Sequence, residues 1–156
     1  MGLDMYLNTN HYYGGKYKND AEHTLKVSGK FVEETSITPS KIMEIKEEVC
    51  YWRKANQIHN WFVVNCYYNH NESSSSIYIS KGMLRKLLSA CLKTLVAYDR
   101  KDWNTVKELL PTQSGFFFGG TDYNEWYRDD IEHTIRMLEP VIDNPSYESF
   151  SYVASW

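Results

Sequence analysis

The chain has 156 residues, 42% of them hydrophobic and 24% charged, which is typical of one globular domain with a single core. Its net charge is −3, with 17 basic and 20 acidic residues interspersed, so the composition argues against a nucleic-acid partner and against a DNA mimic. No apolar stretch has the length of a membrane span, and the first residues lack the features of a signal peptide. We therefore expect a protein of the cytoplasm that does not bind membranes.

Aromatic residues make up 15% of the chain, with 13 Tyr and 5 Trp. Such rings are favoured at recognition surfaces, but they can equally replace aliphatic residues in a core. Cys50, Cys66 and Cys91 form an odd set without a CxxC motif. Because Cys50 and Cys91 fall within apolar patterns, buried free thiols in a reducing compartment are expected.

The first segment, residues 2–8, alternates between apolar and polar side chains, with Leu3, Met5 and Leu7 on one face. This period of two predicts a half-buried strand. Gly14 and Gly15 indicate a turn or flexible loop after it, and residues 23–34 suggest a further hairpin.

A long helix is predicted from about Pro39 to about Asn65, because Thr38 is a suitable N-cap and proline is tolerated in the first turn. At 100° per residue, one face of this helix gathers seven side chains into a single sector. These are Ile42, Ile45, Val49, Trp52, Asn56, His59 and Val63. Two polar residues, Asn56 and His59, therefore point toward whatever the helix packs against.

The polar stretch at residues 67–76 predicts an exposed loop, followed by a short strand at residues 77–79. Ser80 is expected to cap a second helix whose apolar stripe packs in the core. This stripe comprises Leu84, Leu87, Leu88, Cys91, Leu92 and Leu95. A short helix should begin after Asp102 and end before Pro111.

After Pro111 the chain is expected to form a loop that leads into a short strand of three phenylalanines, residues 116–118. Asp122 and Glu125 have capping-box spacing for the third main helix. Its predicted buried face comprises Tyr127, Ile131, Thr134, Ile135 and Leu138, and His133 falls on its polar face. Residues 147–156 predict a final strand. The expected fold is α+β: a single domain over residues 1–156, with an antiparallel sheet packed against three main helices.

The first candidate site is the patch formed by Trp52, Arg53, Asn56 and His59 on the predicted long helix. It combines a stacking plane, a fixed cation, an amide and a titratable ring, a mixture that suits a polar or anionic ligand. The alternative is structural: a buried histidine and asparagine that are hydrogen-bonded to the sheet.

The second candidate site is the loop that contributes Gln113, Ser114, Gly119, Gly120 and Tyr123. The two glycines precede a helix N-terminus, where free N–H groups favour anions, although the GK[ST] ending of a nucleotide-binding loop is missing. Three consecutive phenylalanines cannot all face one side of a strand. At least one must therefore point away from the core, either beneath another element or at a contact surface.

The catalytic motifs are weak throughout the sequence. The five histidines show neither HExxH spacing nor a zinc pattern, and no GxSxG motif is present. A cysteine nucleophile at Cys66 is the only catalytic hypothesis that the residues suggest. No catalytic residue, metal or cofactor is therefore predicted.

The stretches YWRKANQIHNWFVVN and ELLPTQSGFFFGGTDYNEWY, with the opening MGLDMYL and the Ser-Trp ending, resemble a family of small proteins encoded by phages and prophages. The resemblance covers nearly the whole chain, although residues 69–76 depart from the family's pattern. Applied to this sequence, it points to Trp52, Arg53, Asn56, His59, Trp61, the segment 111–120 and Tyr123.

This resemblance implies a phage accessory protein in the cytoplasm of a bacterial host, acting by binding. The first hypothesis is a module that contacts a host or defence-system protein and modulates or inhibits it. The second is a binding protein for a nucleotide or other small anion, or an enzyme without recognisable motifs, with its pocket at the two candidate sites. The sequence leaves the oligomeric state open.

Overall fold

A computed structural model of the chain describes residues 2–12, 42–66 and 75–156. The predicted glycine turn, the hairpin at residues 23–34, the Thr38 cap and most of the polar loop lie outside the described residues. Within them, the α+β class and the antiparallel sheet are confirmed.

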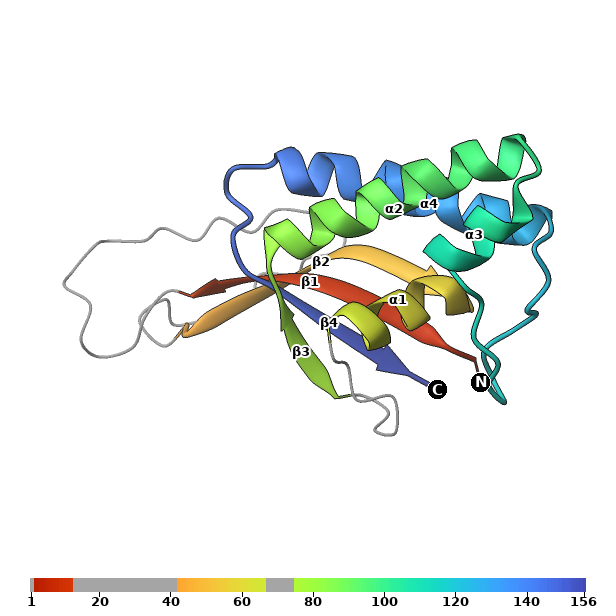
Figure 1. The fold of residues 1–156 in the computed structure, drawn as a ribbon. Helices are drawn as coiled ribbons and strands as arrows, with labels where there is room; N and C mark the ends of the chain where they lie inside the picture. Colours follow the sequence, from red (N-terminus) through yellow and green to blue (C-terminus); the bar gives the residue numbers. More distant parts are fainter. Residues whose placement is uncertain (1, 13–41, 67–74) are drawn as a thin grey trace, which may run out of the picture.

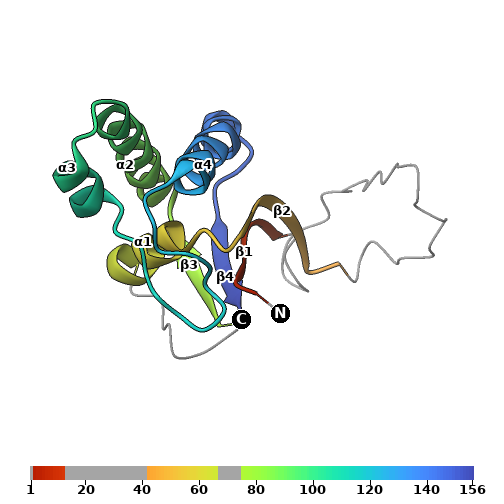
Figure 2. The ribbon, with the colours of Figure 1, turned by 90° about the vertical axis from the view of Figure 1, so that its right-hand side faces the viewer.

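The described residues form four strands and four helices. In chain order these are β1 (Asp4–Tyr12), β2 (Glu44–Arg53), α1 (Asn56–Cys66), β3 (Ser76–Ile79), α2 (Lys81–Asp99), α3 (Trp103–Leu109), α4 (Glu125–Asp143) and β4 (Phe150–Ser155). The sheet has the order β2-β1-β4-β3, with every neighbouring pair antiparallel. All four helices cover the same face of the sheet (Figures 1 and 2).

One of the two inner strands is β1, which pairs with β2 on one side and β4 on the other. Its predicted alternation is confirmed: Leu3, Met5 and Leu7 are fully buried beneath the helices, whereas Asp4 and Tyr6 face the other way. The strand continues to Tyr12, beyond the predicted residues, because β2 supplies pairing partners as far as that residue.

The predicted helix from Pro39 to Asn65 is wrong for residues 44–53, which form β2. Its last part is confirmed, because α1 spans Asn56–Cys66. A β-bulge lies opposite the Leu7–Asn8 step, where Leu7 pairs with Cys50 and Asn8 pairs with Glu48. Val49 is the extra residue, and it breaks the period of two that would have identified a strand.

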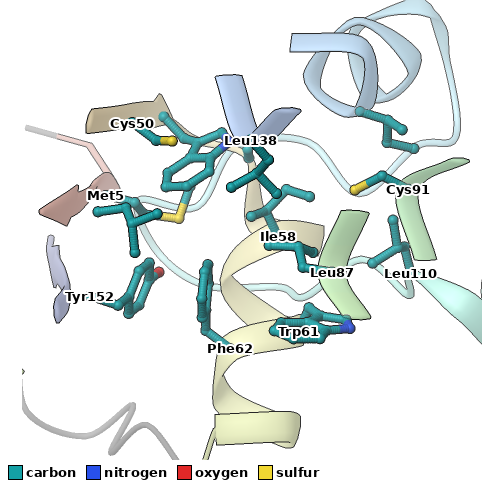
Figure 3. Packing of buried hydrophobic residues seen from close by; sticks show 14 of the residues in the cluster. Met5, Cys50, Ile58, Trp61, Phe62, Leu87, Cys91, Leu110, Leu138 and Tyr152 are labelled. Carbon is teal, nitrogen blue, oxygen red and sulfur yellow. The ribbon is translucent and has the colours of Figure 1, made fainter. Parts of the chain in front are cut away.

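The core fills the space between the inner face of the sheet and the helices (Figure 3). At its centre the rings of Phe62 from α1 and Tyr152 from β4 stack, with centroids 3.9 Å apart. Ile58 and Trp61 of α1 extend the same core toward Leu87 of α2 (Figure 3). The contact of Phe62 with Tyr152 places α1 directly on the sheet.

The predictions for α2 and α3 are confirmed at their starts. Ser80 caps α2 by accepting a hydrogen bond from Met83 N, and Asp102 caps α3 by accepting one from Thr105 N. The apolar stripe of α2 is less buried than predicted, because Leu92 is 44% exposed and Leu88 and Leu95 are half-buried.

The cap of α4 is Asn124 rather than Asp122, since the Asn124 side chain accepts the hydrogen bond from Tyr127 N. The predicted buried face of α4 is confirmed except for half-buried Ile135, and His133 is exposed as expected. The predicted strand at residues 116–118 is wrong: these residues form a turn. The final strand is confirmed as β4.

Candidate functional site

The segment between α3 and α4, residues 110–124, leaves the helical layer, runs past α1 toward the N-terminal end of β1 and returns (Figures 1 and 2). Its base is closed by the Thr112 hydroxyl, which donates to Thr121 O at 3.1 Å, and by Tyr123 Oη, which accepts from Thr112 N at 3.3 Å. A loop of this length with adjoining ends is an Ω-type loop. We call residues 112–121 the Phe loop.

Asn56, the first residue of α1, fixes the Phe loop from inside. Its Nδ2 donates to Phe118 O at 3.1 Å and to Gly120 O at 2.8 Å. Its Oδ1 accepts a hydrogen bond from Gln113 N at 2.9 Å. Because Asn56 is only 2% exposed, these three bonds to both limbs of the loop are shielded from water.

His59 is fully buried one turn after Asn56. Its Nδ1 lies 2.8 Å from the hydroxyl of Tyr152 on β4. The ring makes edge-to-face contacts with Phe118 of the Phe loop and Trp156 after β4, at centroid distances of 5.2 and 5.5 Å. His59 therefore joins α1, the Phe loop and the last strand in one aromatic cluster.

The three phenylalanines of the loop have three different environments. Phe118 is 6% exposed within the His59 cluster, Phe117 is half-buried, and Phe116 is 93% exposed. Gly115 makes this turn possible, since a Cβ there would lie 2.5 Å from the Phe118 ring. Phe117 O accepts a hydrogen bond from Leu3 N at 3.1 Å, which ties the loop to β1. The expectation that one ring points away from the core is confirmed for Phe116.

Trp52 and Arg53 do not join this cluster as the helical interpretation required. Trp52 faces the core from β2, where its Nε1 donates to Thr134 Oγ1 of α4 at 2.8 Å. Arg53 points to the outer side of the sheet, with its side chain 61% exposed and 3.9 Å from Asp4. Of the remaining predicted residues, Ser114, Gly119 and Gly120 are exposed on the Phe loop, whereas Gln113 and Tyr123 are half-buried.

One neighbour of the Phe loop was not identified from the sequence. Lys54, between β2 and α1, lies beside Gly119 and has a left-handed backbone, with φ 60°. A lysine is rare in this conformation, and nothing in the sequence indicates it. Asn56 and the loop residues were identified, but their direct contact could be seen only in the structure.

The electrostatics of the described residues do not favour cysteine chemistry. Burial raises the pKa of Cys66 to about 11 and that of Cys50 and Cys91 to about 12. The reactive thiolate is therefore scarce at neutral pH. Within residues 2–12, 42–66 and 75–156, no group of three or more His, Cys, Asp or Glu side chains could hold a metal ion.

An open hollow of about 230 Å³ lies elsewhere, on the outer face of the sheet, and residues of all four strands line it. None of the predicted site residues is among them.

The described helices include none that is long and apolar enough to cross a membrane. No protein-family model matches the sequence, and no curated protein or solved structure shows significant similarity to it.

Proposed function

We propose that this protein is a phage-encoded accessory protein that modulates a host or defence-system factor through protein–protein contact, with Phe116 as its principal anchor. The observation that carries the proposal is the 93% exposure of Phe116 on a loop that is fixed from beneath. Large apolar side chains at the centre of an interface contribute much of the binding energy when they enter a partner's pocket.

The loop is organised before any partner binds. The Asn56 side chain, the Leu3–Phe117 backbone bond and the buried Phe118 ring hold both sides of the exposed residue. A fixed loop loses little conformational entropy on association, which lowers a cost that flexible binding loops incur. An exposed phenylalanine held in this way is more consistent with a binding surface than with a loop selected only to connect two helices.

Affinity capture from a bacterial host lysate tests the proposal. The full chain is immobilised as wild type, as Phe116→Ser and as Trp126→Ser, where Trp126 is an exposed aromatic on α4, 78% accessible, and serves as the matched control. We expect a protein that binds the wild type and Trp126→Ser but is lost with Phe116→Ser, while all three retain the same melting temperature. If Phe116→Ser captures the same protein as the wild type does, the proposal is refuted.

A nucleotide or other small anionic ligand is the second candidate, because one buried acceptor in the loop lacks a donor that the uncharged N–H or O–H groups of such a ligand could supply. Gln113 Oε1 is buried and accepts no hydrogen bond within the described part of the chain. A ligand N–H or O–H group at that atom would satisfy it. A thermal-shift screen with nucleotides and cyclic dinucleotides tests this function: stabilisation by several degrees, lost in Gln113→Leu, supports it, and no shift with any compound refutes it.

A further inference from the structure

Two exposed cations, Arg53 at the end of β2 and Lys54 directly after it, lead up to the Phe loop, which Lys54 contacts at Gly119. A Cβ added at Gly2 would lie 3.2 Å from Lys54 Cε and 3.8 Å from Arg53 Nε, so both cationic side chains pass close to this glycine. A side chain at Gly119 would likewise begin 3.2 Å from Lys54 Cβ. Lys54 thus lies alongside the loop backbone three residues after Phe116.

The position of Lys54 is rigidly determined. Its backbone N–H donates to Leu3 O at 2.7 Å, and its carbonyl accepts from Asn56 N at 2.8 Å. Leu3 in turn bonds Phe117 O, so Lys54, β1 and the Phe loop share one short network of backbone hydrogen bonds. The left-handed φ of 60° would suit glycine better, yet a long cationic side chain occupies the position.

The positive charge of this patch is only partly neutralised. Asp4 is the nearby carboxylate, and its closest approach to Arg53 is 3.9 Å at a site where the Arg53 side chain is 61% exposed. The same Asp4 Oδ1 already accepts a hydrogen bond from the Tyr51 hydroxyl. An exposed ion pair of this length leaves most of the guanidinium's hydrogen-bonding capacity unused. The surface formed by Arg53, Lys54 and Asp4, where Lys54 contacts the Phe loop at Gly119, therefore carries excess positive charge in a chain whose net charge is −3.

We propose that the surface receiving the Phe loop is an apolar pocket on a folded protein whose rim carries carboxylates facing Lys54 and Arg53. This inference rests on the proposed function, and it adds the chemistry of the partner. The exposed ring requires a concave apolar site, and the adjacent cations select an acidic edge by charge complementarity. A partner whose pocket rim carried basic side chains would be repelled by Lys54 and Arg53.

Zero-length cross-linking tests the contact directly. A carbodiimide couples a lysine amine to a carboxyl group as an amide, with loss of water, only when the two groups touch. The wild-type chain, bound to the protein that it captures from host lysate, is treated and digested, and cross-linked peptides are identified by mass spectrometry. We expect Lys54 joined to an Asp or Glu of the captured protein, and no such product from Lys93 on the exposed side of α2.

Two substitutions make the outcome quantitative. Lys54→Arg keeps the charge but removes the reactive amine, so binding should persist while the cross-link disappears. Lys54→Glu should weaken binding about tenfold at low salt, with less effect at high salt, whereas Lys93→Glu should leave the affinity unchanged.

The possible results separate the two proposals. If Phe116→Ser abolishes capture but Lys54 gives no cross-link and Lys54→Glu binds like the wild type, the acidic rim is refuted and the binding function stands. If capture does not depend on Phe116, both proposals fail.

Discussion

Asn56 was predicted either to bind a ligand or to be buried for structural reasons, and its contacts favour the structural role. Its amide makes three hydrogen bonds to loop backbone that is otherwise without secondary structure. A buried amide that is fully engaged by its own chain stabilises the fold and is not available to a ligand. Its functional importance is indirect, because the loop that it fixes presents Phe116.

Asn56→Ala is expected to lower the free energy of unfolding by about 2–4 kcal/mol, since it leaves two carbonyls and one N–H of the loop without partners in a buried site. Urea denaturation followed by circular dichroism measures the change. Asn56→Asp should also destabilise, because a carboxylate keeps the acceptor but cannot donate to the carbonyls of Phe118 and Gly120. A loss below about 0.5 kcal/mol in both variants would contradict this account.

Two glycines of the Phe loop provide a matched pair. Gly115→Ala should destabilise the protein by about 1–3 kcal/mol, because the new methyl group would overlap the buried Phe118 ring. Gly120→Ala should be nearly neutral, since nothing lies within 4 Å of its added Cβ. Thermal unfolding of the two variants under identical conditions tests the difference, and equal melting temperatures would rule out the overlap.

At the scale of elements, the sequence predicted β1, α2, α3, most of α4 and β4, because each has a clear period or a recognisable cap. It failed at β2, where Ile45, Val49 and Trp52 are spaced by four and three residues, as on a helix. The bulge at Val49 creates this spacing, and it depends on pairing with β1. Local periodicity contains no information about such a distant partner.

The sequence predicts the candidate site only in part. Helical periodicity places Asn56 and His59 on one face of a helix from Pro39, yet they belong to a helix that begins at Asn56 itself. Both lie on its buried side, so their burial was anticipated correctly. Their partners, Phe118 and Tyr152, lie 59 or more positions away in the sequence and could not be identified from spacing.

Two element junctions contain a lysine in the left-handed conformation: Lys54 before α1, with φ 60°, and Lys101 after α2, with φ 58°. Replacing either with glycine should raise the free energy of unfolding by up to about 1 kcal/mol, because glycine adopts this conformation without strain. The greater freedom of glycine in the unfolded chain offsets part of the gain. Chemical denaturation of the two variants measures the effect, and destabilisation of both would disprove the strain.

For the whole molecule, the buried thiols predict a loss of stability in alkali. The pKa of Cys91 is raised by burial from near 9 to about 12. As pH rises between these values, the unfolded chain releases the proton while the folded chain retains it, so the free energy of unfolding falls. By about pH 10.5 this contribution amounts to roughly 2 kcal/mol.

Cys91→Ala isolates that contribution, because the other groups that titrate in alkali remain in both proteins. We expect the variant to be less stable than the wild type near neutral pH, because removing the buried sulfur leaves a small cavity. The difference in free energy of unfolding between the wild type and Cys91→Ala should decrease by about 2 kcal/mol between about pH 8 and about pH 10.5, as measured by urea denaturation at each pH. A gap that stays constant would show that Cys91 ionises normally in the folded protein.

The pairing of β1 with β4 also has a consequence for the order of synthesis. Asp4 pairs with Ser155 and Thr9 pairs with Phe150, so β1 finds one of its two neighbours in a strand that is made only after all four described helices. On the ribosome, Met5 and Leu7 therefore remain without their β4 partners until translation has passed Ser155. Contacts of such high sequence separation form slowly, and the unpaired edge of β1 is open to aggregation meanwhile. Folding of this sheet is therefore completed only after β4 has emerged from the ribosome.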